Sequence, residues 1–459
     1  MKYRIILLIS IILISISCDS DNPDLVPNDP PSSSKNLIQL SAQVDFEGRS
    51  IKTNAVLDRN TGTIFFPVGA DLSSIKIEFG ISQKAKLFLQ GEEMLSGSSR
   101  VDFNNRLNFE VVAEDGSKRE YEITSISKFE EMEAALLAFM EDFNVPGLQF
   151  AIIRNEKLVY QGSLGLSDVE NNTKVKNNSL FRIASISKPI TSIAIYNLAQ
   201  KGELSLNMTV FGDNGVLGKR YGDGEYPDNI KLIQVRHLLD HTSGFTNNPY
   251  DIMFDDPSLT QDQLISEVLD NRGLSSSPGT TYYYSNFGYS LLGRIIEEVS
   301  GKNYERYVLD EVLGPAGISD MRIGGNLLEE KFENEVVYYE QEGFSPYSMN
   351  VTRMDSHGGW IASASDLARF LVTIDRGIGV PDIVGTPFIE REYFGYENWW
   401  FSGSLPGTST VISRMDNNFS FVILTNTRTI PIESILQQME KIMRLQIQAR
   451  SIWPSYDLF

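Results

Sequence analysis

Strand patterns stand at both ends of the segment 129–446, and helical patterns fill its middle. The strand patterns cover 148–153, 157–160, 408–414 and 419–424. Short turns separate the members of each pair, so each pair is typical of an antiparallel hairpin. Amphipathic helices are predicted before the first pair, over 129–143, and after the second, over 432–446. The pattern predicts an α+β fold, with one antiparallel sheet built from both ends, flanked by helices and joined to a mostly helical lobe.

The segment 37–127 has a different pattern, made of short alternating runs rich in β-branched and aromatic residues. Such runs, with turn residues between them, are typical of strands in an all-β sandwich. The stretch 111–123, with its Asp115-Gly116 turn, is similar to the last hairpin of the immunoglobulin-like (Ig-like) modules of bacterial surface lipoproteins. We expect an N-terminal Ig-like sandwich that acts as a spacer. The alternative is a module that contacts glycan or protein.

The first eighteen residues have the layout of a signal peptide. Lys2 and Arg4 precede an apolar run, 5–16, that is too short for a comfortable membrane span. Cys18, the only cysteine, follows at once and resembles the acylated cysteine of a bacterial lipobox. The resemblance implies a lipid-anchored protein of the bacterial cell envelope, facing either the periplasm or the surface. A plain secretory signal or an uncleaved anchor is the alternative.

Two further segments cannot form a core of their own. Residues 19–36 are rich in Pro, Ser, Asn and Asp and are predicted to be a flexible linker. Residues 447–459 follow the last predicted helix as a C-terminal tail. The chain has 459 residues, too many for a single core, so several domains are expected. Its formal net charge of −20 argues against nucleic acid as a partner.

Ser185 and Lys188 form a Ser-x-x-Lys motif at the start of a helical pattern that ends at Gly202. A spacing of three places the two side chains on one helix face, one turn apart. A lysine that is desolvated enough to lose its own proton can remove the proton of the serine hydroxyl. The motif is short and also occurs by chance, so a second element has to support it.

Tyr284 and Asn286 supply that element as a Tyr-x-Asn motif, about one hundred residues later and just before another amphipathic helix. A phenol close to the serine and lysine could pass a proton to a leaving group. An asparagine amide beside it could fix the lysine and bind a substrate carbonyl. Taken alone, the aromatic run 282–284 is more often core packing.

Two longer segments complete the pattern. His-Leu-Leu-Asp-His-Thr-Ser-Gly-Phe occupies 237–245, and Gly-Gly-Trp-Ile-Ala-Ser-Ala-Ser-Asp-Leu-Ala-Arg-Phe occupies 358–370. With the two short motifs, they resemble the signatures of the class C β-lactamase and penicillin-binding-protein superfamily of serine hydrolases, over 129–446. The resemblance implies a β-lactamase-like fold and an acyl-enzyme on Ser185. It also implies shared acid/base duty for Lys188 and Tyr284, substrate positioning by Asn286, and no metal or organic cofactor.

The third motif of this superfamily is usually Lys-Thr-Gly or His-x-Gly, and the best match here is Phe401-Ser402-Gly403-Ser404. By resemblance, the backbone N–H of Ser404 would join that of Ser185 in an oxyanion hole. Phe401 departs from the pattern, because a phenyl ring can neither donate a hydrogen bond nor hold a positive charge. It therefore cannot bind a substrate carboxylate as lysine would, which argues against an efficient β-lactamase.

The three histidines allow other interpretations. His237 and His241 have i, i+4 spacing and could bind zinc with a third ligand, but Leu238-Leu239 stands where a metalloprotease has its glutamate. We expect structural hydrogen bonding from both. His357 is predicted to line the pocket mouth and partly compensate for Phe401. An α/β-hydrolase triad has no support, because the sequence has no Gly-x-Ser-x-Gly.

The sequence therefore predicts a serine hydrolase that acts through Ser185 on an ester, amide or D-amino peptide substrate. The first alternative is a catalytically weak relative of the penicillin-binding proteins that binds cell-wall or peptide ligands, which Phe401 favours. The second is that the Ig-like module carries the biology by docking glycan.

Overall fold

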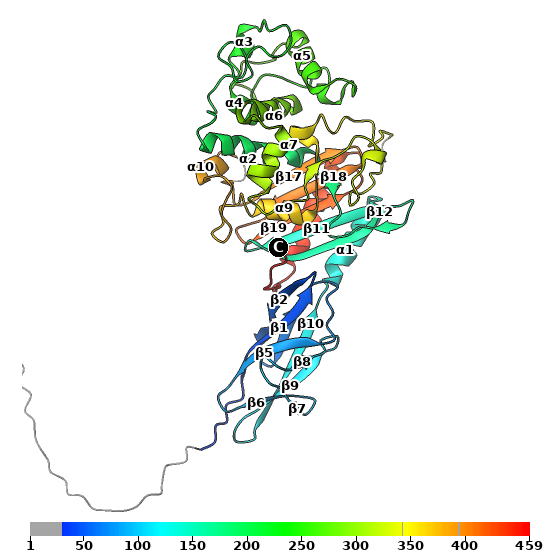
Figure 1. Ribbon diagram of the computed structural model, residues 1–459. Helices are drawn as coiled ribbons and strands as arrows, with labels where there is room; N and C mark the ends of the chain where they lie inside the picture. Colours follow the sequence, from blue (N-terminus) through cyan, green and yellow to red (C-terminus); the bar gives the residue numbers. More distant parts are fainter. Residues whose placement is uncertain (1–29, 342, 393–394) are drawn as a thin grey trace, which may run out of the picture.

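The computed structural model describes residues 30–341, 343–392 and 395–459. The predicted signal peptide, Cys18 and most of the predicted linker lie outside the described residues. Within the described ranges, no helix is both long and apolar enough to cross a membrane. Figure 1 shows an all-β part, coloured blue to cyan, below a larger part that mixes helices and strands.

The all-β part contains two sheets. One has the order β2 (Arg49–Asn54), β1 (Leu37–Phe46), β5 (Ile75–Ile81), β8 (Arg100–Val101). The other has the order β3 (Val56–Asp58), β4 (Thr61–Phe65), β10 (Lys118–Ile126), β9 (Leu107–Val112), β6 (Lys86–Leu89), β7 (Glu92–Glu93). Residues from both sheets, such as Leu40, Ile77 and Phe109, are fully buried. The strands predicted over 37–127 are therefore present, whereas the likeness to Ig-like modules stays a prediction.

The main sheet joins the two ends of the larger part. Its order is β13 (Thr173–Lys174), β12 (Lys157–Asp168), β11 (Gly147–Arg154), β19 (Phe419–Thr425), β18 (Thr408–Arg414), β17 (Trp399–Leu405). The joint is the antiparallel pair of β11 and β19, in which Phe150 lies opposite Ile423. The predicted sheet built from both ends of the segment is confirmed, and β17 forms one of its edges.

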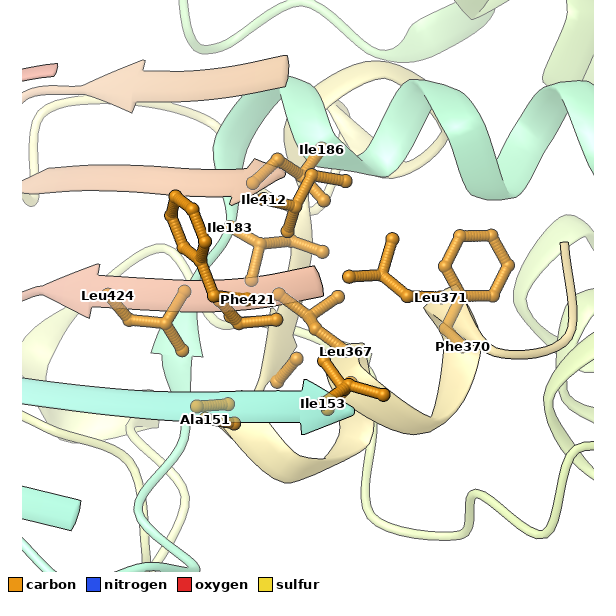
Figure 2. Packing of buried hydrophobic residues seen from close by; sticks show 14 of the residues in the cluster. Ala151, Ile153, Ile183, Ile186, Leu367, Phe370, Leu371, Ile412, Phe421 and Leu424 are labelled. Atoms are coloured by element: carbon orange, nitrogen blue, oxygen red, sulfur yellow. The ribbon is translucent and has the colours of Figure 1, made fainter. Parts of the chain in front are cut away.

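Helices cover this sheet, and every residue of β18 is buried. α9 (Ala364–Leu371) packs against β11 and β19, and α11 (Ile432–Gln448) packs against β18 and α1 (Glu130–Asp142). Figure 2 shows Leu367 and Leu371 of α9 among the apolar residues of the sheet. The remaining helices form the predicted helical lobe, shown above the sheet in Figure 1. The main ones are α2 (Ser187–Gln200), α4 (Val235–Leu239), α5 (Gln261–Asn271), α6 (Asn286–Ser300) and α7 (Tyr304–Val308).

The segment that follows α11 packs back onto the protein. Trp453, Tyr456 and Leu458 are buried, and the backbone N–H of Leu458 donates to the carbonyl of Leu158 on β12. The guanidinium of Arg49, on β2 of the all-β part, donates to the carbonyl of Leu458 over 2.7 Å. In Figure 1 the label C lies where the two parts meet. The predicted tail is thus part of the contact between them.

Candidate active site

Ser185 lies in a short 3₁₀ turn, η1 (Ala184–Ile186), immediately before α2. Ile183 and Ile186 are fully buried and lie beside Ile412 of β18 (Figure 2), which fixes the turn on the sheet. Ala184 has φ +49°, a left-handed conformation that residues with a Cβ seldom adopt. Such strain collects at functional sites, where the surrounding packing enforces it. Ser185 itself is half-buried, so the residue keeps part of its surface exposed to solvent.

Lys188 lies in the first turn of α2, with its amine directed at the serine. Its Nζ is 3.2 Å from Oγ of Ser185 and donates to the carbonyl oxygen of His357 over 2.8 Å. The side chain is only 1% exposed. Burial lowers the pKa of Lys188 to about 7, against the opposing effect of the Asp251 carboxylate. Near neutral pH a large fraction of this amine is therefore uncharged and can accept a proton.

Tyr284 completes the hydrogen-bonded group. Its phenol donates to Oγ of Ser185 over 2.8 Å, and Nζ of Lys188 lies 4.9 Å from the centre of its ring. Burial raises the pKa of Tyr284, so the phenol keeps its proton at neutral pH. The structure thus brings together the three predicted catalytic residues, with a neutral base and a protonated acid on one hydroxyl.

Asn286 begins α6, two residues beyond Tyr284, and is 8% exposed. Its amide nitrogen donates to Oδ2 of Asp251 over 2.6 Å, whereas the sequence predicted Lys188 as its partner. Asp251 raises the pKa of Lys188 by its charge, so it links the Tyr-x-Asn motif to the lysine electrostatically. Asp251 is a site residue that sequence reasoning missed, because it belongs to none of the motifs.

The third motif lies on edge strand β17, beside the turn that carries Ser185. Gly403 is in tight contact with that turn. A Cβ at this position would be 2.2 Å from the carbonyl oxygen of Ile183 and 3.0 Å from the backbone nitrogen of Ser185. Only glycine lets the strand approach so closely. This places the strand that carries Ser404 next to the backbone of Ser185, as the predicted oxyanion hole requires.

Phe401 lies two residues earlier on β17 and is half-buried. Its ring lines a pocket of about 330 Å³ together with Lys188 and Tyr284. The aromatic residue of the third motif therefore faces the same space as Lys188 and Tyr284.

His357 is not at the pocket mouth. It lies on α8 (Asp355–Gly358) and is 2% exposed, and its contact with the site is the main-chain carbonyl that accepts from Lys188. Its Nε2 has no hydrogen-bond partner among the described residues. The expectation that its side chain compensates for Phe401 at the mouth is wrong in position, because the imidazole is enclosed behind the lysine.

The other two histidines accept backbone hydrogen bonds through Nδ1. His237 accepts from the N–H of Gln234 over 3.2 Å, and His241 accepts from the N–H of Ser285 over 3.1 Å. The ring of His241 also packs on Tyr284, with 4.7 Å between centroids, and burial lowers its pKa to about 3. His241 is therefore neutral, and its ring packs against the ring of Tyr284. Among the described residues, no three His, Cys, Asp or Glu side chains gather as a metal site.

Comparisons with known sequences agree with this geometry. The family model described as Beta-lactamase matches residues 132–432. Penicillin-binding protein 4* of Bacillus subtilis (strain 168) is 34% identical over 170 residues, which are 36% of this chain and 35% of that protein. Protein flp of Staphylococcus aureus (strain MRSA252) is 29% identical over 206 residues, 44% of this chain and 39% of that protein. The matches thus span little more than a third of these relatives.

Solved structures share the fold. The octameric penicillin-binding protein homologue from Pyrococcus abyssi has a TM-score of 0.56 and 25% identity, covering 69% of this chain and 77% of that one. D-amino acid amidase from Ochrobactrum anthropi SV3, complexed with L-phenylalanine amide, has a TM-score of 0.56 and 18% identity, covering 70% of this chain and 100% of that one. Because the family match covers well over half of the chain and the nucleophile, base and acid are in place, this protein belongs to the Beta-lactamase family of serine hydrolases.

Proposed function

We propose that this protein hydrolyses an ester, amide or D-amino peptide through an acyl-enzyme on Ser185. The observation that carries the proposal is the contact of one serine hydroxyl with a buried lysine at 3.2 Å, whose pKa is lowered to about 7, and with a protonated tyrosine at 2.8 Å. A nucleophile with its base and acid in hydrogen-bond reach is the arrangement that acyl transfer requires. The D-amino acid amidase and a D-alanine carboxypeptidase from Burkholderia cenocepacia have the same fold at 18% and 16% identity, which leaves this chain's substrate to experiment.

The chemical steps follow from which groups of the site hold a proton and which can accept one. Lys188 takes the hydroxyl proton of Ser185 as Oγ attacks the substrate carbonyl. The backbone N–H groups of Ser185 and Ser404 stabilise the oxyanion that forms. Tyr284 then protonates the leaving group and recovers a proton from Lys188. In deacylation, water gives a proton to the same pair, attacks the ester carbonyl and releases the acid, and Ser185 regains its proton.

Phe401 argues against substrates whose own carboxylate is the group that an enzyme recognises. A cationic or hydrogen-bonding group at this position would attract such a substrate, whereas a phenyl ring offers apolar surface. We therefore propose turnover of neutral or cationic substrates and poor turnover of β-lactams. Asn286 and His357 would act as positioning residues, through the groups they hold, Asp251 and Lys188.

The test is labelling of the purified protein by a fluorophosphonate probe, with Ser185→Ala as the matched control. Labelling that is lost in Ser185→Ala supports the proposal. Unlabelled wild-type protein is then assayed on short-chain esters, D-amino peptides and a chromogenic cephalosporin, and faster turnover of the cephalosporin than of the others would contradict the substrate assignment. A protein that is not labelled but binds muropeptide tightly would select the second candidate, a catalytically weak binding protein, which Phe401 favours.

We further propose that Cys18 is lipidated, that this lipid anchors the protein to a membrane of the bacterial cell envelope, and that the β-sheets of 37–127 form an Ig-like spacer. The support is the charged and apolar leader with its single cysteine. Incorporation of labelled palmitate that is lost in Cys18→Ser tests the anchor. Glycan binding by the whole protein that survives in Ser185→Ala and is lost on changing residues of 37–127 would give those strands a binding role.

A further inference from the structure

The pocket that Phe401 shares with Lys188 and Tyr284 has a lining of unusual chemistry. Six of its thirteen residues are Tyr, Trp or Phe, and two are acidic. The full lining is Lys188, Pro189, Ser192, Leu239, Asp240, His241, Tyr282, Tyr284, Tyr289, Glu392, Trp399, Trp400 and Phe401. Its volume of about 330 Å³ suits a single aromatic or similar apolar group. Aromatic ring faces attract cations as well as apolar surface.

Glu392 supplies the acid that the reaction does not use. Its carboxylate accepts a hydrogen bond from the phenol of Tyr196, which packs under α10 (Thr386–Ile389). Burial raises the pKa of Glu392 to about 7, and the negative charge of Asp240 adds to this rise. A cation that enters the pocket would stabilise the charged form of this carboxyl, which burial otherwise disfavours.

Two basic residues of the protein, Arg391 and Lys188, lie near the pocket. Arg391 lies beside Glu392 in the chain; its guanidinium forms an ion pair with Asp240 at 2.5 Å, and its charge offsets only part of the rise in the pKa of Glu392. Lys188 is largely neutral above pH 7, and the charge that acts on it is that of Asp251. At pH 8 the pocket therefore combines the carboxylate of Glu392 and ring faces with a lysine that opposes a cation only weakly.

We propose that this pocket is a subsite for an organic amine, a group with an aromatic or large apolar body and a protonated nitrogen that pairs with Glu392. The body packs between Phe401, Trp400 and the tyrosines, and the nitrogen lies at the acidic end. This proposal rests on the proposed hydrolase function, since the pocket is a substrate subsite only if Ser185 reacts with what it holds. It gives that function a substrate class, an ester or amide that carries a free amine.

The test compares three probes that share a phenylethyl body and differ in charge: 2-phenylethylamine, 2-phenylethanol and 3-phenylpropionate. Binding to Ser185→Ala is measured by isothermal titration calorimetry at pH 8. We expect the amine to bind roughly tenfold more tightly than the alcohol, and the carboxylate most weakly. Equal binding of amine and alcohol, or tightest binding of the carboxylate, would overturn the proposal.

Glu392→Gln, introduced into Ser185→Ala, identifies the charge responsible. It keeps an acceptor for Tyr196, and we expect it to reduce the affinity for the amine to that for the alcohol. The matched control is Glu390→Gln, two residues away, whose carboxylate is exposed and pairs with Arg376. It should leave the order unchanged. Trp400→Ala should weaken all three probes by a similar factor and keep their order, because Trp400 packs on the phenylethyl body that they share and not on the charged group.

The two proposals can fail separately. Fluorophosphonate labelling of Ser185, together with no preference for the amine, would contradict the amine subsite and still support the hydrolase function. A preference for the amine that Glu392→Gln abolishes, in a protein that is never labelled, would support the amine site and overturn its assignment as a substrate subsite. An amine preference that persists in Glu392→Gln would contradict the role of this carboxylate.

Discussion

The amine of Lys188 lies 3.2 Å from the hydroxyl of Ser185, and its second contact is the main-chain oxygen of His357 at 2.8 Å. An uncharged amine has two N–H donors and one lone pair. One donor is used by the carbonyl of His357, which leaves the lone pair available to the hydroxyl of Ser185. The buried backbone of α8 therefore orients the base, and burial of the same lysine makes it a base at neutral pH.

The rate of Ser185 acylation should rise with pH through about 7. Below this value Lys188 is protonated and cannot accept a proton, and above it the neutral form dominates, so the sign is an increase with pH. We expect the second-order rate of fluorophosphonate labelling to rise about tenfold between pH 6 and pH 8. Lys188→Arg, which stays charged, should be labelled at every pH as slowly as the wild type is at low pH. A flat wild-type profile would contradict the lysine as base.

Removing the phenol of Tyr284 should slow acylation without unfolding the protein. Tyr284→Phe keeps the ring that packs on His241 and loses only the hydroxyl that donates to Ser185. Loss of a positioned acid typically costs about 10²-fold or more in rate. The rate of ester hydrolysis measures this. Tyr283→Phe is the matched control, since Tyr283 is 40% exposed, and equal rates in the two variants would rule out Tyr284 as the acid.

The sequence predicted the parts of the fold that depend on periodicity. The two hairpins of the main sheet, with their helices, occur where the alternation and the helical spacing placed them, because each faces one core. The nucleophile, base and acid were also predicted, since each lies in a short motif next to a helix start. A contact between a side chain and its own helix turn, such as that of Ser185 and Lys188, is encoded by spacing.

Other features depend on contacts between distant segments. Asp251 accepts from Asn286, and the carbonyl of His357 accepts from Lys188, 169 residues away in the chain. A main-chain contact does not depend on the residue type. The sequence therefore predicts a role for the side chain of His357 at the pocket mouth, whereas the residue acts through its carbonyl behind Lys188. The left-handed Ala184 has no sequence signal either, because alanine is compatible with many conformations and only the packing of its neighbours enforces this one.

A methyl group at Gly403 should damage the site more than the fold. In Gly403→Ala the new Cβ would meet the carbonyl oxygen of Ile183 at 2.2 Å, and because this oxygen belongs to the backbone, the clash is relieved only by moving β17 away from Ser185. Overpacking of this kind costs about 1–3 kcal/mol. We expect a modest fall in Tm and a fall in labelling rate of at least about tenfold. Ser402→Ala, on the same strand, should change neither, and a normal labelling rate in Gly403→Ala would refute the close approach.

The segment after α11 should contribute strongly to stability. Trp453 is 3% exposed and packs on Phe129 and Phe419, with ring centroids 5.2 Å and 5.3 Å away. Phe129 in turn meets Phe65 of the all-β part, so this cluster ties the main sheet, the C-terminal segment and the all-β part together. Truncating a buried tryptophan to alanine costs about 3–5 kcal/mol.

Trp453→Ala should therefore lower Tm by several degrees, measured by differential scanning calorimetry, while the labelling rate of the folded protein at 25 °C stays close to wild type, because the cluster lies away from Ser185. Ile452→Ala is the control, since Ile452 is 37% exposed and its loss should cost only a few tenths of a kcal/mol. If both variants melted with the wild type, the C-terminal segment would be a dispensable tail. If Trp453→Ala instead melted in two separate steps, the aromatic cluster would be what makes the all-β part and the hydrolase part unfold together.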